Sequence, residues 1–241
     1  MTTVLLLRHG RTASNAAGVL AGWTPGVGLD DVGRGQAEAV AGRLAALPLA
    51  AIVSSPLERC QQTAVAVAGG RTLDLASDDR LGEARYGDWT GRALKELAKE
   101  PLWKVVQAHP SAAVFPGADA TGTPGEGLAA MQARAVEAVR EWNVRLGPDA
   151  VWLACSHGDV IKGIVADALG LHLDQFQRIS VDPCSLTVIR YTELRPFVLR
   201  VNDTGGGVEG LVPAAPRKGR KRKPPSSDAA VGGGAGPAGS G

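Results

Sequence analysis

Two histidine–glycine pairs, far apart in the chain, each follow a short apolar run of the kind found in buried strands. His9 and Gly10 follow Val4–Leu7, and His157 and Gly158 follow Val151–Ala154. Glycine lets the backbone turn sharply, so we expect both histidines at strand ends. Arg8 precedes the first histidine, and imidazole with guanidinium suits anion binding and metal-free phosphoryl chemistry. The two pairs predict one anion site built from distant segments.

A third predicted strand end supplies further donors. Ser54 and Ser55 follow Ala51–Val53, and Arg59 lies one helical turn beyond Ser55, within reach of the strand ends. We expect Arg8 and Arg59 to bind non-bridging phosphate oxygens, with Asn15 as a neutral donor. Any one of these residues alone is more often an ordinary polar side chain. The convergence of three strand ends favours a site.

Three other polar residues near helices receive a plainer interpretation. Asp159, two residues after the second histidine, is a candidate acid, and the plainer alternative is that it caps the next helix. His109 and His172 do not end a strand, so we interpret them as ordinary polar residues outside the site.

Apolar periodicity predicts alternating strands and helices, which is typical of an α/β three-layer sandwich with a mainly parallel central sheet flanked by helices. The predicted strands are Val4–Leu7, Ala51–Val53, Leu73–Leu75, Val151–Ala154 and a closing pair, Leu186–Tyr191 and Phe197–Val201. The predicted helices are Asp31–Leu47 with Asp30 as N-cap, Pro56–Val67, Leu94–Gln107 interrupted at Pro101, Gly125–Arg145 and Val160–Leu169.

The composition changes near Asn202, which predicts a domain over 1–203 and a disordered Gly/Pro-rich basic tail over 204–241. The tail has six basic and two acidic residues, so the rest of a chain of net charge +2 is slightly acidic and does not resemble a nucleic-acid binder. We interpret the run Arg217–Lys223 as a solvated tail in preference to a nucleic-acid contact. Deleting the tail should leave turnover intact.

Several partner classes are not expected. The chain has no run of eighteen apolar residues, so we expect no membrane span. Three scattered cysteines without a Cys-x-x-Cys spacing argue against a zinc site and favour a reducing cytoplasm. No clustered ligand spacing indicates a metal, and we expect no cofactor. The closing strands around Leu186–Val201 offer an edge through which a homodimer can form.

Four motifs in a fixed order resemble those of the histidine phosphatase superfamily, also called the phosphoglycerate-mutase-like family. They are Arg8-His9-Gly10-x-Thr12-x-x-Asn15, Ser54-Ser55-Pro56-x-x-Arg59-x-x-Gln62-Thr63, Leu81-x-Glu83-x-x-x-Gly87-x-Trp89-x-Gly91 and Ser156-His157-Gly158. One Arg-His-Gly alone is weak evidence. Four ordered motifs that span nearly everything up to Asn202 are strong evidence.

The resemblance implies a phosphoglycerate-mutase-like fold and a catalytic role for three residues. His9 would attack phosphorus and form a phosphohistidine, and Glu83 would protonate the leaving alkoxide and then activate water. His157, with Arg8, Arg59 and Asn15, would stabilise charge on the phosphoryl oxygens. Only the motif singles out Glu83. Apolar neighbours such as Tyr86 and Trp89 would raise the pKa of that carboxyl group, which suits an acid.

The resemblance leaves three functions open. A phosphatase acting on small phosphorylated metabolites is favoured, because Arg92–Thr123 lacks the adjacent arginine pair of the mutases' long basic insertion. Hydrolysis also does not require the site to exclude water. The alternative is a 2,3-bisphosphoglycerate-dependent phosphoglycerate mutase. A non-catalytic module that binds phosphorylated ligands is less favoured, because all the expected catalytic groups are present.

Overall fold

A six-stranded sheet forms the centre of the computed structural model, which describes residues 1–206, 229 and 231–236. Its strand order is β3-β2-β4-β1-β5-β6. The strands are β1 (Thr2–Arg8), β2 (Ala51–Ser54), β3 (Leu75–Ser77), β4 (Val151–Ser156), β5 (Leu186–Tyr191) and β6 (Pro196–Asp203).

Parallel pairing brings together the strand ends that carry the predicted site residues. β1 pairs with β4, and β2 pairs with β4 and β3, all in parallel. Arg8 stands opposite Ser156 and Ser54 opposite Cys155, so β1, β2 and β4 end at one edge of the sheet. β5 and β6 complete the sheet in antiparallel pairs. The predicted α/β fold with a mainly parallel sheet is confirmed.

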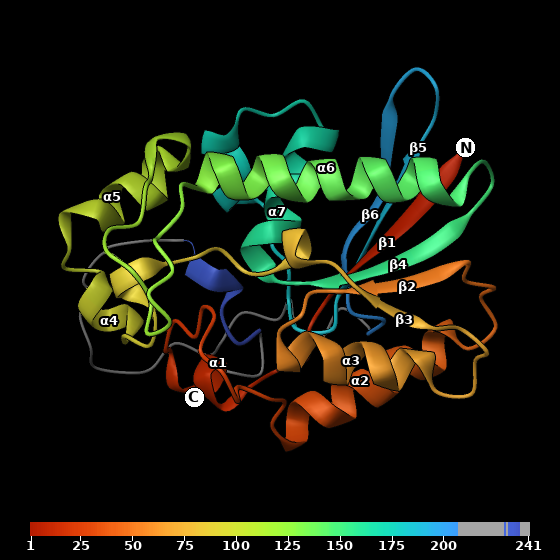
Figure 1. Cartoon of the computed structure of the whole chain (residues 1–241), viewed down its shortest axis with the longest axis horizontal. Helices are drawn as coiled ribbons and strands as arrows, with labels where there is room; N and C mark the ends of the chain where they lie inside the picture. The colour runs from red at the N-terminus through yellow and green to blue at the C-terminus, as the bar shows by residue number, and fades with distance from the viewer. Residues whose placement is uncertain (207–228, 230, 237–241) are drawn as a thin grey trace, which may run out of the picture.

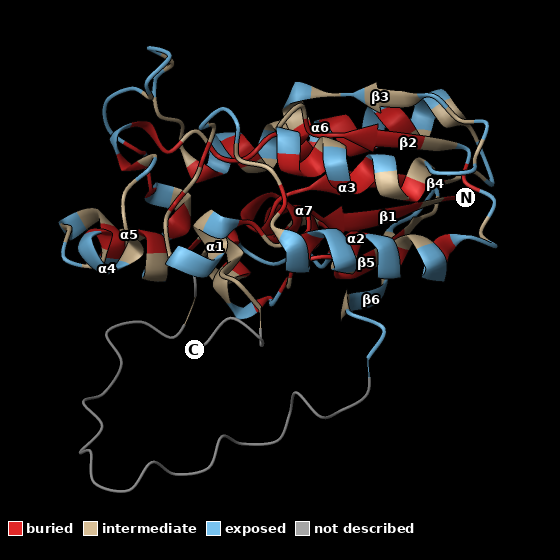
Figure 2. Ribbon diagram, turned by 90° about the horizontal axis from the view of Figure 1, so that it is seen from below, coloured by how far each residue is buried: buried red, intermediate tan, exposed pale blue. Residues whose placement is uncertain are grey.

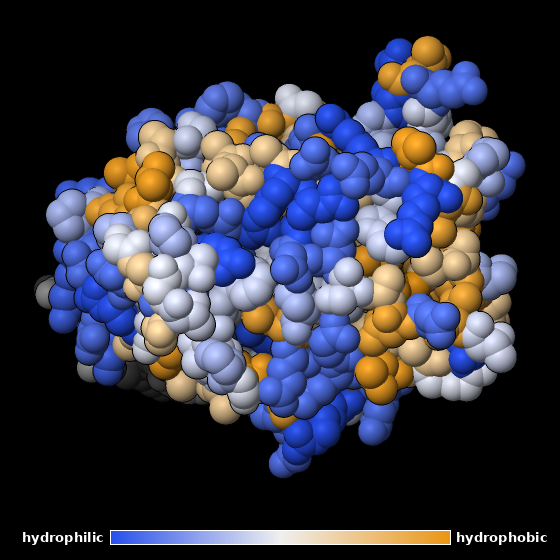
Figure 3. Space-filling model, in the orientation of Figure 1, coloured by the Kyte–Doolittle hydropathy of each residue, from blue (hydrophilic) through white to orange (hydrophobic). Residues whose placement is uncertain are grey.

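Helices cover both faces of the sheet (Figure 1). α2 and α3 lie on one face, and α6 and α7 on the other. The helices are α1 (Ala13–Ala17), α2 (Asp31–Leu44), α3 (Glu58–Ala68), α4 (Leu94–Leu97), α5 (Pro101–Ala108), α6 (Leu128–Leu146) and α7 (Gly158–Ala168). The middle of the outward surface of α6 is hydrophilic (Figure 3), as expected for a helix with one buried face.

Strand β1 explains why a continuous apolar run suits this position. Successive side chains of a strand point to opposite faces. Leu5 and Leu7 pack in the core beneath α2 and α3, whereas Val4 and Leu6 pack in the core beneath α6 and α7. The central strands are therefore buried on both faces (Figure 2).

The predicted elements are present, but several boundaries differ by a few residues. α3 begins at Glu58 rather than Pro56, because Leu57 takes an extended conformation at the N-cap. The predicted break at Pro101 is confirmed, since it separates α4 from α5. The short helix α1 was not predicted. A reciprocal capping box between Thr12 and Asn15 begins it.

The described part of the predicted tail is ordered against the domain. Val231 is 1% exposed and opens a 3₁₀ turn, Val231–Gly233, which contacts α7. This differs from the disorder predicted for all of 204–241. The basic run Arg217–Lys223 lies outside the described residues. Within the described residues, no helix combines the length and apolarity needed to cross a bilayer.

Two glycines allow the loop after β1 to lie closely against α2, because neither has a side chain. A Cβ atom built on Gly33 would lie 2.0 Å from the carbonyl oxygen of Arg11, and one on Gly10 would lie 2.6 Å from the carbonyl oxygen of Gly33. Such contacts require the backbone to move. The close approach therefore fixes the path of the chain that carries His9.

We predict opposite effects for two alanine substitutions in α2. Gly33→Ala should lower the free energy of unfolding by about 2 kcal/mol or more, because the contact with Arg11 outweighs the helix propensity gained. Gly35→Ala is the matched control, since a Cβ atom there meets nothing within 4 Å. It should stabilise the protein by about 0.5–1 kcal/mol. Urea denaturation measures both; equal effects would contradict the close approach.

Candidate active site

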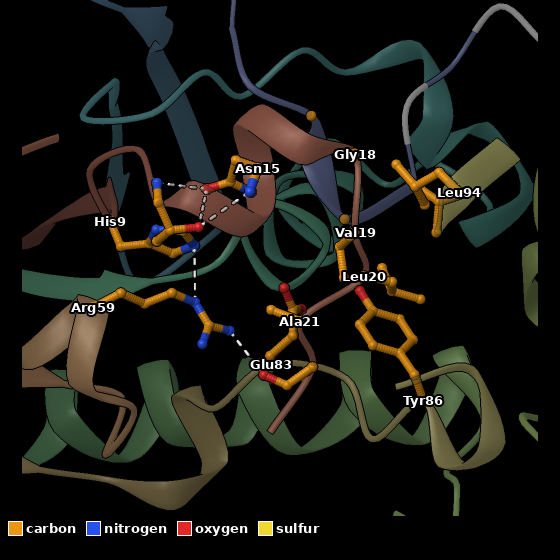
Figure 4. A pocket seen from close by; sticks show the side chains of 15 residues that line it. His9, Asn15, Gly18, Val19, Leu20, Ala21, Arg59, Glu83, Tyr86 and Leu94 are labelled. Carbon is orange, nitrogen blue, oxygen red and sulfur yellow. Dashed lines mark hydrogen bonds between the residues drawn. The ribbon is translucent and has the colours of Figure 1, made fainter. Parts of the chain in front are cut away.

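The strand ends bring the predicted site residues together around a small cavity of about 30 Å³. His9, Asn15, Arg59 and Glu83 line it, together with Tyr86 (Figure 4). His9 and Asn15 lie at one end and Tyr86 at the other. Of the other predicted residues, Arg8 and His157 are fully buried next to this lining.

His9 is held as a neutral imidazole with a free nitrogen. Its Nδ1 lies 2.7 Å from the carbonyl oxygen of Gly10, which can only accept, so Nδ1 carries the proton. Its Nε2 is then unprotonated and accepts a hydrogen bond from Arg59 Nε at 3.2 Å. Burial, followed by the charges of Arg59 and Arg8, holds the pKa of His9 well below its usual value.

His157 shares Arg59 with His9. Its Nδ1 lies 3.2 Å from Arg59 Nη2, and its Nε2 lies 2.8 Å from Ser55 Oγ. Because Arg59 can only donate, Nε2 carries the proton and donates to Ser55. Burial and then the charge of Arg59 lower the pKa of His157 well below its usual value. The two imidazole rings meet edge to face with centroids 5.2 Å apart.

Glu83 is a buried carboxyl group whose pKa is raised to about 7. Burial is the largest cause and the charge of Asp159 the next, while Arg59 opposes both. The direction expected from the sequence is therefore present, with Asp159 as an unforeseen contributor. One carboxylate oxygen accepts from the amide of Ala84 at 3.0 Å, and the other lies 3.8 Å from His157 Nδ1. That histidine is neutral, so the second contact is no ion pair.

The backbone at Glu83 is fixed by two long side chains. Its carbonyl oxygen accepts from Trp23 Nε1 at 2.6 Å and from Arg134 Nη2 at 3.0 Å. Arg134 also forms an ion pair with Glu126 from the start of the α6 region. These contacts hold a loop carboxylate at a defined place beside the cavity.

Arg8 is bound differently from what the sequence suggests. Its Nη1 donates to the carbonyls of Val181 at 2.8 Å and Gly233 at 2.6 Å. Its Nη2 donates to those of Gly232 at 3.3 Å and Gly234 at 2.6 Å. Nε has no hydrogen-bond partner among the described residues. Backbone carbonyls thus hold the terminal nitrogens expected to bind phosphate.

Asn15 lines the cavity from the first turn of α1. Its Oδ1 accepts from the backbone amide of Thr12 at 3.1 Å and from the hydroxyl of Thr12 at 3.0 Å. The capping box therefore orients the side-chain amide, and Nδ2 is the atom that can donate to an anion.

The interpretation of Asp159 as a helix cap is wrong. His157 holds the N-cap position of α7, and Asp159 is 1% exposed within the first turn. Its Oδ2 accepts from the Tyr86 hydroxyl at 3.0 Å and from the Gly232 amide at 2.9 Å. Lys162 Nζ lies 3.4 Å from Oδ1. Sequence spacing is compatible with the Lys162 contact, which is an i,i+3 pair, but gave no signal for the contacts with Tyr86 and Gly232, which lie in distant segments.

The histidines interpreted as ordinary polar residues lie outside the site. His109 and His172 are both exposed and lie within 4 Å of Asp174. Neither lines the cavity next to His9. The structure thus separates the two histidines at strand ends from the two in connecting segments.

Comparison with known proteins supports the reading of these motifs. The model of the histidine phosphatase superfamily (branch 1) matches residues 4–204. Phosphoserine phosphatase 1 of Hydrogenobacter thermophilus is 29% identical over 85% of this chain and 93% of its own. "Probable phosphoglycerate mutase GpmB" of Yersinia pseudotuberculosis is 30% identical over 80% of this chain and 86% of its own.

A solved structure agrees with the sequence relatives. Bacillus stearothermophilus YhfR superposes with a TM-score of 0.75 at 30% identity, covering 84% of this chain and 98% of its own. The fold, the order of the motifs and the grouping of their side chains around one cavity all agree with these similarities. The chain belongs to the histidine phosphatase superfamily, branch 1, and is an enzyme with the phosphatase or phosphomutase activity of that family.

Proposed function

We propose that the chain is a metal-independent phosphomonoester hydrolase that acts through a phosphohistidine on small phosphorylated metabolites. One observation carries the proposal. The same buried cluster lowers the pKa of His9 and raises that of Glu83 to about 7. A neutral nucleophile and a protonated acid are therefore available together near neutral pH.

In the first step, His9 Nε2 attacks phosphorus in line with the ester oxygen. A P–N bond forms as the P–O bond breaks, and Glu83 gives its proton to the leaving alkoxide. Arg59 already donates to that nitrogen, and it moves its hydrogen bonds to the equatorial oxygens. The donors Arg8 Nε and Asn15 Nδ2 stabilise the same charge. His157 joins them once Arg59 has left its Nδ1 and the proton lies on that nitrogen, with the Ser55 hydroxyl then donating to Nε2.

In the second step, Glu83 works in reverse. Its carboxylate takes a proton from water, the oxygen of that water attacks phosphorus, and the P–N bond breaks. Inorganic phosphate and neutral His9 are the products. Glu83 regains from water the proton that it gave to the alcohol, so the enzyme returns to its starting state. No redox change occurs.

Hydrolysis is favoured over phosphoglycerate mutase activity by the segment after the acidic motif. Among the few cations of the segment Arg92–Thr123, Arg92 forms an ion pair with Glu100 at 2.7 Å. Its charge is therefore already partnered and is less available to bind the second anionic group of a mutase substrate. The mutase remains the second candidate, because several relatives from Yersinia carry that name. We also propose a cytoplasmic location, because the three cysteines are free and a reducing compartment keeps thiols in that state. A homodimer through the sheet edge at β6 is a further proposal.

We predict that purified protein hydrolyses an aryl phosphate in the presence of a chelator and that His9→Ala abolishes turnover. The nucleophile carries the whole covalent route, so the loss should exceed about 10³-fold. Acid quenching should trap phosphate on His9. His109→Ala, in an exposed histidine outside the site, is the matched control and should match the parent.

Three results would contradict parts of this proposal. Full activity of His9→Ala or an absolute requirement for a metal would reject the mechanism. Interconversion of 3-phosphoglycerate that needs 2,3-bisphosphoglycerate as a primer would place the mutase first. Tight phosphate binding without any turnover would favour the non-catalytic module.

We predict a pH dependence that separates acid from nucleophile. For an alkyl phosphate, kcat/KM should fall above about pH 7 as Glu83 loses its proton. It should stay level as pH falls through 6.5, because the lowered pKa keeps His9 neutral there. A p-nitrophenyl ester, whose leaving group needs no proton, should show a much weaker alkaline fall.

Glu83→Gln tests the source of this alkaline limb. It should slow hydrolysis of the alkyl ester by about 10²–10⁴-fold and remove the limb. Glu38→Gln, an exposed residue of α2, is the control. An unchanged limb in Glu83→Gln would show that another group titrates.

A further inference from the structure

The segment Val231–Gly236 lies beside His9 and Arg8, and several residues of the domain contact it. Val231 is 1% exposed, and Gly232 and Gly234 line the same cavity as His9. Just before the segment, Gln107 donates to the carbonyl of Ala229 at 3.2 Å. At its far end, Gly236 packs on Pro183. A glycine-rich stretch of the chain therefore forms one wall of the cavity.

Its polar contacts take the places that a phosphorylated ligand would use. Three successive carbonyls, those of Gly232, Gly233 and Gly234, accept from the two terminal nitrogens of Arg8. The Gly232 amide donates to the buried carboxylate of Asp159 at 2.9 Å. The carbonyls are neutral acceptors, whereas a phosphate brings negative charge and can bind the guanidinium through two parallel hydrogen bonds. An arriving phosphate can therefore compete for Arg8.

The glycines permit this close approach. Gly232, Gly233 and Gly234 have φ of 70°, 78° and 60°, in the left-handed region that side chains disfavour. A Cβ atom on Gly233 would lie 3.0 Å from Cζ of Arg8 and 3.1 Å from Cα of Gly158. One added methyl group at this position would therefore strain the segment and push it away from the guanidinium.

The segment narrows the cavity, whose volume is about 30 Å³, because Val231, Gly232 and Gly234 form part of its lining. Its carbonyls also occupy both terminal nitrogens of Arg8. A phosphoryl group that binds these nitrogens must take the place of the carbonyls. The segment and a phosphomonoester bound to Arg8 therefore exclude each other.

We propose that Val231–Gly236 is an intramolecular competitor that occupies the site until a phosphorylated substrate displaces it. The inference rests on the proposed function, in which this cavity binds phosphomonoesters. Because the segment belongs to the same chain as the site, its effective concentration there is on the order of millimolar. Even if the segment binds the site weakly, it then raises the apparent Kd of the substrate, because only chains with an undocked segment can bind substrate. Deleting the tail should therefore leave kcat unchanged, as the sequence predicts, but should lower KM.

The test compares Gly233→Ala with Gly206→Ala in the full-length chain. Both add one methyl group to the chain after residue 203. A Cβ atom on Gly233 would meet Arg8, whereas one on Gly206 would meet only Thr204 Oγ1, at 3.9 Å. Gly233→Ala should lower KM and the Kd for inorganic phosphate on the order of tenfold, with kcat retained. Gly206→Ala should match the parent. In the parent, adding phosphate should speed hydrogen exchange at the Gly232 amide.

The outcomes separate the competition from the proposed chemistry. Equal KM and phosphate Kd in the three chains, or exchange at Gly232 that phosphate leaves unchanged, would overturn the competition. A raised KM or a lowered kcat in Gly233→Ala would also overturn it, and would show instead that the segment positions Arg8. Phosphate binding that shifts between variants without any turnover would reject the proposed function and leave the competition standing.

Discussion

The rest of the site depends on one constraint, the burial of two guanidinium groups beside two imidazoles. Arg8 is 0% and Arg59 3% exposed, so their charges are poorly screened by water. Both histidines must then stay neutral, since a further positive charge at this distance would be strongly unfavourable. The cluster is left with an excess of donors and positive charge. A dianionic phosphoryl group is the ligand that relieves it.

The sheet supplies the geometry that this constraint needs. β1 and β4 run in parallel and place both histidines at one edge, while α3, which follows β2, brings Arg59 between them. The carboxyl groups Glu83 and Asp159 enter from the opposite face and partly balance the guanidinium charges. Burial, followed by the negative charge of Asp159, raises the pKa of Glu83 to about 7. The acid and the nucleophile therefore arise from the same charge distribution.

Much of the fold and part of the site could be predicted from the sequence, and the reasons are physical. The apolar run before His9 indicates a strand buried on two faces, and the parallel pairing of such strands brings their ends together. Ser55 as the partner of His157 and Asp159 as the partner of Tyr86 could not be predicted, because each pair joins distant segments through side-chain rotamers. The order at Val231 also escaped prediction. Its glycine-rich composition indicates disorder, and only burial against the domain opposes that tendency.

On the proposed competition, Asp159 links the occupancy of the site to the pKa of Glu83. With the segment in place, the Gly232 amide and the Tyr86 hydroxyl both donate to Oδ2 and reduce its effect on Glu83. When substrate displaces the segment, the amide is withdrawn, and the negative potential at Glu83 increases. The incoming phosphoryl charge acts in the same direction. On the proposed competition, binding of the substrate therefore favours the protonated form of Glu83 at the step that needs a proton. Departure of the alcohol with that proton leaves the carboxylate beside Arg59, which opposes the raised pKa and stabilises the base that the second step requires.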